Sequence, residues 1–142
     1  MRKSVVCVFA GLVLLFGISE SCKKKPTTPP GGGTTEANLV VTLTPPVNSL
    51  QPAAPQTDFP LVVAITSTMP SQGVTISVSA KRDDGSGTAD FFTNTSNTSN
   101  GTSNISITGT PVNVICITTV TLTSRSKPSN TWTGTYRYSR KP

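Results

Sequence analysis

Acidic side chains gather around one predicted turn of this 142-residue chain. Asp83 and Asp84 precede Gly85, and Asp90 follows shortly after them. Clustered carboxylate oxygens are the ligands that hard cations such as Ca²⁺ prefer. The spacing is not that of a calcium loop, however, and Asp before Gly is typical of turns because Asp tolerates the backbone angles that a turn needs. The sequence therefore favours a turn over a metal site, and it indicates no metal ion and no cofactor.

Hydroxyl side chains are abundant, but the sequence offers them no base. The chain contains 24 Thr and 17 Ser, whereas His is absent. No Ser lies in a Gly-x-Ser-x-Gly elbow, and Lys81 and Lys127, which could pair with a Ser, both lie beside predicted turns. We therefore expect a protein that is not an enzyme. A small hydrolase is an alternative that would require a concave pocket with convergent polar groups.

A cluster of aromatic residues near the C-terminus is the candidate binding surface. Trp132, Tyr136 and Tyr138 share one face of a predicted strand, while Arg137 lies on the other face. If the aromatic face pointed outward, its rings could stack on sugars, as aromatic platforms do in carbohydrate-binding sandwiches. Because aromatic side chains bury a large apolar area, we expect Trp132 and Tyr136 to lie in the core instead.

The composition favours short strands that position these residues. Thr, Ser, Gly and Pro are poor helix-interior residues, and they suit strands joined by turns. Alternation of apolar and polar residues predicts seven strands. Six are at 39–44, 61–65, 74–80, 89–93, 112–122 and 132–138, and the fifth in chain order starts with Ile105 and Ile107.

Two longer segments lack this alternation and are predicted to be loops that could contact a partner. Residues 45–57 carry four Pro, and residues 94–104 read NTSNTSNGTSN. The second segment is polar throughout and contains four Asn-x-Ser/Thr sequons, at Asn94, Asn97, Asn100 and Asn104. Its composition predicts a solvated loop.

Seven strands with one apolar face each can bury those faces between two packed sheets. We therefore expect residues 38–142 to form an all-β domain, an immunoglobulin- or fibronectin-like antiparallel sandwich, with a small β-barrel as the alternative. From Asn38 onward the sequence contains seven basic residues and four Asp, so the net charge of the domain is only about +3. That charge indicates no nucleic-acid partner.

The N-terminal residues have the layout of an export signal. Arg2 and Lys3 precede a 14-residue apolar run, Val5 to Ile18. Such a run is shorter than the roughly 20 residues of a membrane-spanning helix, and it fits the apolar region of a signal peptide over residues 1–21.

The stretch Ser21-Cys22-Lys23-Lys24-Lys25 resembles bacterial lipoproteins, especially those of Bacteroidota. In that family the Cys becomes the mature N-terminus and is acylated on its thiol and its amine. The resemblance implies that Cys22 is lipidated and that membrane lipid is its partner. It places the protein in the bacterial envelope, at the periplasmic face of the outer membrane or on the cell surface. A cleaved signal with a soluble product is the alternative.

Residues 22–37 are predicted to be the lipidated Cys and a Lys-, Pro- and Gly-rich linker. Cys7 would leave with the signal peptide, so Cys116 would be the only thiol in the domain, where we expect it to be buried as a small hydrophobic residue. The sequence therefore predicts an anchored binding or structural module whose protein or glycan partner it does not identify. A filament subunit built by strand exchange is a further alternative.

Overall fold

The computed structural model describes residues 35–142. The predicted signal peptide, Cys22 and most of the predicted linker lie outside the described residues. All described residues fall in one compact unit. No helix in residues 35–142 is long and apolar enough to cross a membrane. Residues 35–142 contain seven strands, β1 (Val41–Thr44), β2 (Phe59–Ile65), β3 (Val74–Arg82), β4 (Phe92–Thr98), β5 (Thr102–Ile107), β6 (Ile115–Ser124) and β7 (Thr131–Ser139).

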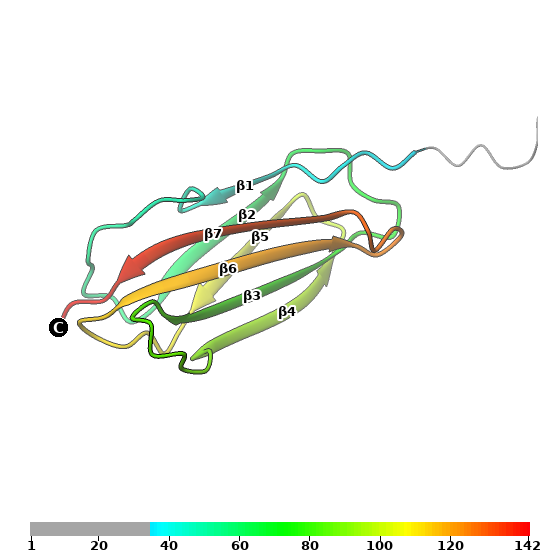
Figure 1. Ribbon diagram of the computed structural model, residues 1–142. Coiled ribbons are helices and arrows are strands. Elements are labelled where there is room, and N and C mark those ends of the chain that lie inside the picture. Colours follow the sequence, from blue (N-terminus) through cyan, green and yellow to red (C-terminus); the bar gives the residue numbers. More distant parts are fainter. Residues whose placement is uncertain (1–34) are drawn as a thin grey trace, which may run out of the picture. The chain divides into compact units, whose positions relative to one another are not determined.

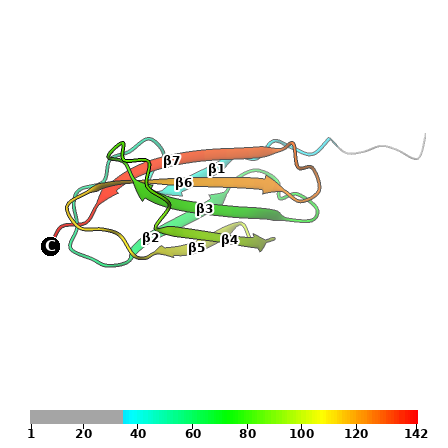
Figure 2. The same cartoon turned by 60° about the horizontal axis from the view of Figure 1, so that its bottom comes forward.

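The strands form two separate antiparallel sheets, in the order β1-β2-β5 and β4-β3-β6-β7 (Figure 1). The prediction of a seven-stranded antiparallel sandwich is therefore confirmed, and the barrel alternative is wrong because the sheets do not close on each other. The view turned about the horizontal axis shows β4 and β5 next to each other at the bottom of the molecule (Figure 2).

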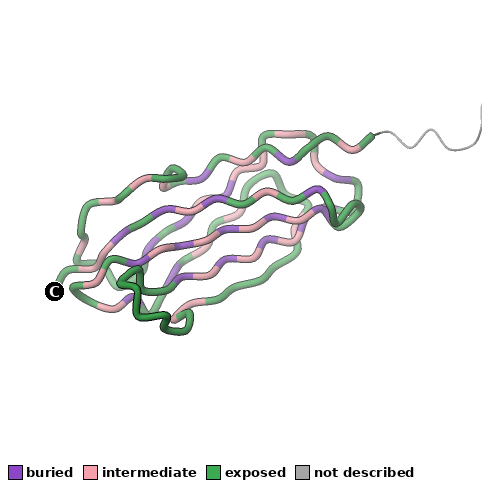
Figure 3. Tube along the Cα trace, viewed as in Figure 1, coloured by how far each residue is buried: buried purple, intermediate pink, exposed green. Residues whose placement is uncertain are grey.

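The core lies between the sheets and is built by strict alternation along the central strands. In β6 and β7, buried residues alternate with more exposed ones, as the burial colours along these strands show (Figure 3). The same alternation places Val74, Ile76, Val78 and Ala80 of β3 inside, each at most 2% exposed. Each large aliphatic side chain buried in this way contributes about 1.5–3 kcal/mol to folding.

The segment predicted to be a solvated loop, 94–104, is instead mostly strand. It supplies most of β4 and the first half of β5, and the strand predicted at 89–93 begins at Phe92. The prediction failed because β4 is an edge strand whose side chains are solvated on both faces, so it has no apolar alternation to detect. Its Thr residues nevertheless have high β-propensity.

Residues 45–57 lie outside the seven strands, but part of this segment runs along β7. The N–H of Asn48 donates to the carbonyl of Thr135 at 2.7 Å, and the N–H of Gln51 donates to the carbonyl of Arg137 at 2.8 Å. Leu50 forms an isolated parallel bridge to Arg137 of β7, and Ala54 forms one to Arg140, directly after the strand. The chain thus leaves β1 in one sheet and covers the outer edge of the other.

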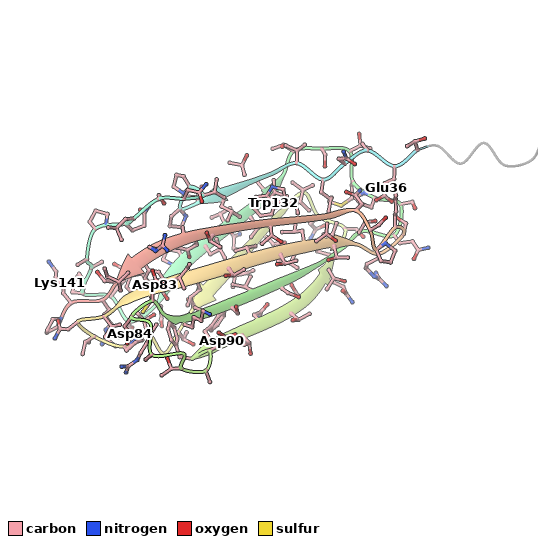
Figure 4. All side chains as sticks on the ribbon, viewed as in Figure 1. Glu36, Asp83, Asp84, Asp90, Trp132 and Lys141 are labelled. Atoms are coloured by element: carbon pink, nitrogen blue, oxygen red, sulfur yellow. The ribbon has the colours of Figure 1, made fainter. Side chains whose placement is uncertain are left out.

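Asn130, in the turn between β6 and β7, binds the residues that precede β1 through hydrogen bonds. Its Oδ1 accepts a hydrogen bond from the N–H of Leu39 at 3.0 Å, and its Nδ2 donates to Glu36 Oε1 at 2.7 Å and to the carbonyl of Ala37 at 2.9 Å. Ser126 Oγ donates to the other Glu36 oxygen at 2.6 Å. Glu36 and Ala37, which the sequence assigns to the linker, therefore pack on the domain, with Glu36 beside this turn (Figure 4).

The hydrogen bonds from Ser126 and Asn130 hold the pKa of the Glu36 carboxyl below its ordinary value. The ionised carboxylate is the form that accepts these bonds. The contact is therefore complete above the ordinary glutamate pKa and is lost as the pH falls through the lowered value.

Replacing Asn130 by alanine is expected to lower the free energy of unfolding by about 2 kcal/mol, because the buried N–H of Leu39 loses its acceptor. Urea unfolding of residues 35–142 measures this change. The exposed Asn38 is the matched control, and Asn38→Ala should change stability by less than about 0.5 kcal/mol. Equal effects of the two substitutions would contradict the role assigned to Asn130.

Candidate functional site: the open side of the sandwich

The aromatic residues singled out from the sequence point inward. Tyr136 and Tyr138 are each 1% exposed, and Trp132 is partly buried against the core. The Phe59 and Tyr138 ring centroids lie 4.5 Å apart, and those of Tyr136 and Tyr138 lie 5.9 Å apart. Trp132 lies on β7 (Figure 4). An aromatic sugar platform on β7 therefore has no support from the placement of these rings.

Arg137, Asp83 and Asp84 divide between an ion pair and a turn. Arg137, on the outer face of β7, forms an ion pair with Asp83. Asp84 accepts hydrogen bonds from the hydroxyl and the backbone N–H of Ser86, which lower the pKa of its carboxyl. Within residues 35–142, no three His, Cys, Asp or Glu side chains are grouped so that they could hold a metal ion. Asp83 and Asp84 thus serve the turn after β3.

An apolar cavity of about 370 Å³ lies beneath the segment that follows β1. Its lining includes Pro45, Pro52, Phe59, Tyr136 and Tyr138. The Tyr138 hydroxyl is satisfied by Thr110 Oγ1 at 3.0 Å, whereas the buried Tyr136 hydroxyl has no hydrogen-bond partner among the described residues. Burial raises the pKa of both phenols, that of Tyr138 to about 12. The cavity is therefore an apolar space with neutral phenols in its wall.

A larger hollow, of about 540 Å³, opens between β4 and β5 and is polar. Most of its lining consists of amide and hydroxyl side chains, with Phe92 and Ile105 as the apolar exceptions. Asn94 and Ser96 lie opposite Val78 and Ile76 in the register, so they occupy the inward face of β4. On β4, polar residues occupy inward positions that are apolar on the inner strands. The two sheets therefore do not pack against each other through apolar side chains along this side.

The backbones of β4 and β5 are also unpaired on this side. Each strand ends the order of its sheet, so among the described residues each has a neighbour on one side only. No charged residue lies between Asp90 and Arg125, a stretch that contains both strands. We call this surface, formed by β4, β5 and the hollow between them, the open side.

Away from the row that contains Lys81 and Arg137, the outer face of the four-stranded sheet continues the same uncharged chemistry. Side chains on it align in rows across the four strands, as in the row formed by Thr95, Ser77, Thr121 and Thr133. Two hydrogen bonds join β3 and β4 across this face: Thr75 Oγ1 donates to Asn97 Oδ1 at 2.8 Å, and Ser77 Oγ lies 3.4 Å from Thr95 Oγ1. The sheet thus carries hydroxyl and amide groups up to its free edge.

Cys116 is fully buried in β6, opposite Tyr138. Burial raises the pKa of its thiol to about 11, so the reactive thiolate is scarce at neutral pH. Cys116 therefore packs as a small hydrophobic residue.

Sequence reasoning identified the segment that forms the open side but assigned it to a loop. The useful signal was present in the Thr residues at every second or third position of Thr93–Thr98, since Thr is common in exposed strands. No family model, no curated protein and no solved structure matches this chain.

Proposed function

We propose that this chain is a non-enzymatic, lipid-anchored β-sandwich of the bacterial envelope, held to the membrane through Cys22, which makes binding or structural contacts through its open side. The observation that supports a contact role is the pair of adjacent, uncharged edge strands, β4 and β5, with a polar hollow between them. Strand edges left unprotected in this way are templates for pairing with another chain.

The way the chain enters the domain is consistent with anchoring. Glu36 and Ala37 are fixed to Asn130 beside the turn between β6 and β7, at one end of the long strands (Figure 1). A tether arriving at that end would leave the length of the open side accessible. Acyl chains on Cys22 would hold the domain strongly, since each buried methylene contributes about 0.8 kcal/mol.

Replacing Cys22 by alanine in the full chain tests the anchor. We expect the variant to be lost from the membrane fraction, or to accumulate as an unprocessed precursor, because it has no thiol to acylate. Fractionation of cells followed by mass spectrometry of the N-terminal peptide measures both outcomes.

Cys7→Ala is the matched control, because Cys7 lies in the predicted signal peptide and should be removed with it. This variant should fractionate like the unaltered protein. A membrane-bound Cys22→Ala product with normal processing, or an unmodified Cys22 in the unaltered protein, would contradict the proposal.

A further inference from the structure

We propose that the partner of the open side is a second copy of this chain, paired antiparallel along β4 about a two-fold axis that passes beside Thr95. The inference rests on the proposed contact role of the open side and names its partner. It would join two four-stranded sheets into one continuous sheet of eight strands.

The edges of the sandwich are not equally available. The outer edge of β7 is covered by the segment around Asn48 and Gln51, which hydrogen-bonds to it. β1 has only four residues and is followed directly by Pro45 and Pro46, which cannot donate backbone hydrogen bonds. The edges of β4 and β5 have no such protection.

Of these two, β4 is the better pairing edge. It has seven residues without Pro, Gly or charge, and Thr93–Asn97 are all exposed. In β5, by contrast, every second residue is at least partly buried. Charged residues, Pro and bulges are the usual devices that prevent pairing at a strand edge. The sequence of β4 contains no charged residue and no Pro.

The sequence of β4 is also compatible with a copy of itself. An antiparallel pair centred on Thr95 places Thr95 opposite its own symmetry mate. Thr93 then lies opposite Asn97, and Asn94 lies opposite Ser96. All of these pairs are uncharged and can form hydrogen bonds, and the existing contacts between β3 and β4 already join the same kinds of groups.

The chemistry of this edge favours a second copy over other partners. A charged partner would find no counter-charge anywhere between Asp90 and Arg125. An apolar donor strand would place its side chains in a hollow lined by Asn94, Ser96 and Asn104. A second β4 brings neither an unpaired charge nor apolar side chains into the polar hollow. A contact with two-fold symmetry also closes on itself, so it forms a dimer and not a filament. Tethering both copies to one membrane would raise their effective concentration, so a weak contact suffices.

Sedimentation equilibrium of residues 35–142 over a range of concentrations tests the proposal. This part of the chain contains all seven strands and the whole core cluster in one compact unit. We expect a reversible monomer–dimer equilibrium. Thr95→Lys, which sets two like charges directly opposite each other, should raise the dimer dissociation constant at least tenfold.

Thr133→Lys is the matched control, since Thr133 is an exposed Thr in the same row of the same sheet face, at the far strand. It should leave the dissociation constant unchanged. A protein that stays monomeric up to millimolar concentration, or a dimer that Thr95→Lys weakens no more than Thr133→Lys does, would overturn the proposal. Either result would leave the membrane anchor intact, because Cys22→Ala tests that separately.

Discussion

Tyr138→Ala is expected to lower the free energy of unfolding by about 4 kcal/mol. The side chain is 1% exposed, and its ring packs against those of Phe59 and Tyr136 between the two sheets. Removing a buried aromatic side chain costs about 3–5 kcal/mol, because apolar burial is lost and a cavity remains. Urea unfolding followed by far-UV circular dichroism measures this change.

Tyr138→Phe is the control that separates packing from hydrogen bonding. It keeps the ring but removes the hydroxyl that lies 3.0 Å from Thr110 Oγ1. Since Thr110 is itself buried, Tyr138→Phe should lower the free energy of unfolding by about 1–2 kcal/mol. A Tyr138→Ala variant no less stable than Tyr138→Phe would show that the ring does not hold the sheets together.

Gly134→Ala is expected to destabilise the domain by about 1–3 kcal/mol, although alanine is normally the better strand residue. A Cβ atom at this position would lie 2.7 Å from Val47 Cγ1 and would overlap the indole ring of Trp132. Overpacking of this kind forces neighbouring side chains from their preferred rotamers. Because Trp132 is the only Trp, its fluorescence should shift in the variant, and chemical unfolding gives the energy.

Gly101→Ala is the matched control for this effect. A Cβ atom at Gly101 would have only the carbonyl oxygen of Ile65 nearby, at 3.9 Å, and no positive φ restricts the substitution. We expect this variant to be as stable as the unaltered protein, or up to about 1 kcal/mol more stable. If Gly134→Ala were equally harmless, the close packing of the Trp132 ring over Gly134 would be wrong.

The inner strands were predictable because their environment imposes alternation. In β3, Val74 to Ala80 lie between two neighbouring strands and have one buried face, so the two-residue period appears directly in the sequence. The start of β6 was less predictable. Val112 and Val114 share the parity of the buried Cys116, but they precede the strand, and Val112 is 44% exposed.

The open side was predictable in composition but not in structure. Asn94 and Ser96 occupy the inward face of β4, on which Phe92 is the only apolar residue, so no apolar alternation distinguishes the rest of β4 from a polar loop. Only the pairing with β3, which depends on residues distant in sequence, makes this segment a strand. The contact of Glu36 with Asn130 was unpredictable for the same reason, since 94 positions separate the two residues.

Disulfide trapping on the intact cell tests the central claim that the anchored domain meets a second copy through the β4 edge. Residues directly opposite each other in an antiparallel pair have Cα atoms about 4.5–5.5 Å apart, which a disulfide can span. Full-length Thr95→Cys should therefore form a covalent dimer in the proposed location, the bacterial envelope, which is an oxidising compartment. Thr133→Cys should remain monomeric, and Cys116 should not contribute, because its thiol is buried. Absence of the Thr95→Cys dimer, or equal cross-linking of both variants, would contradict the account.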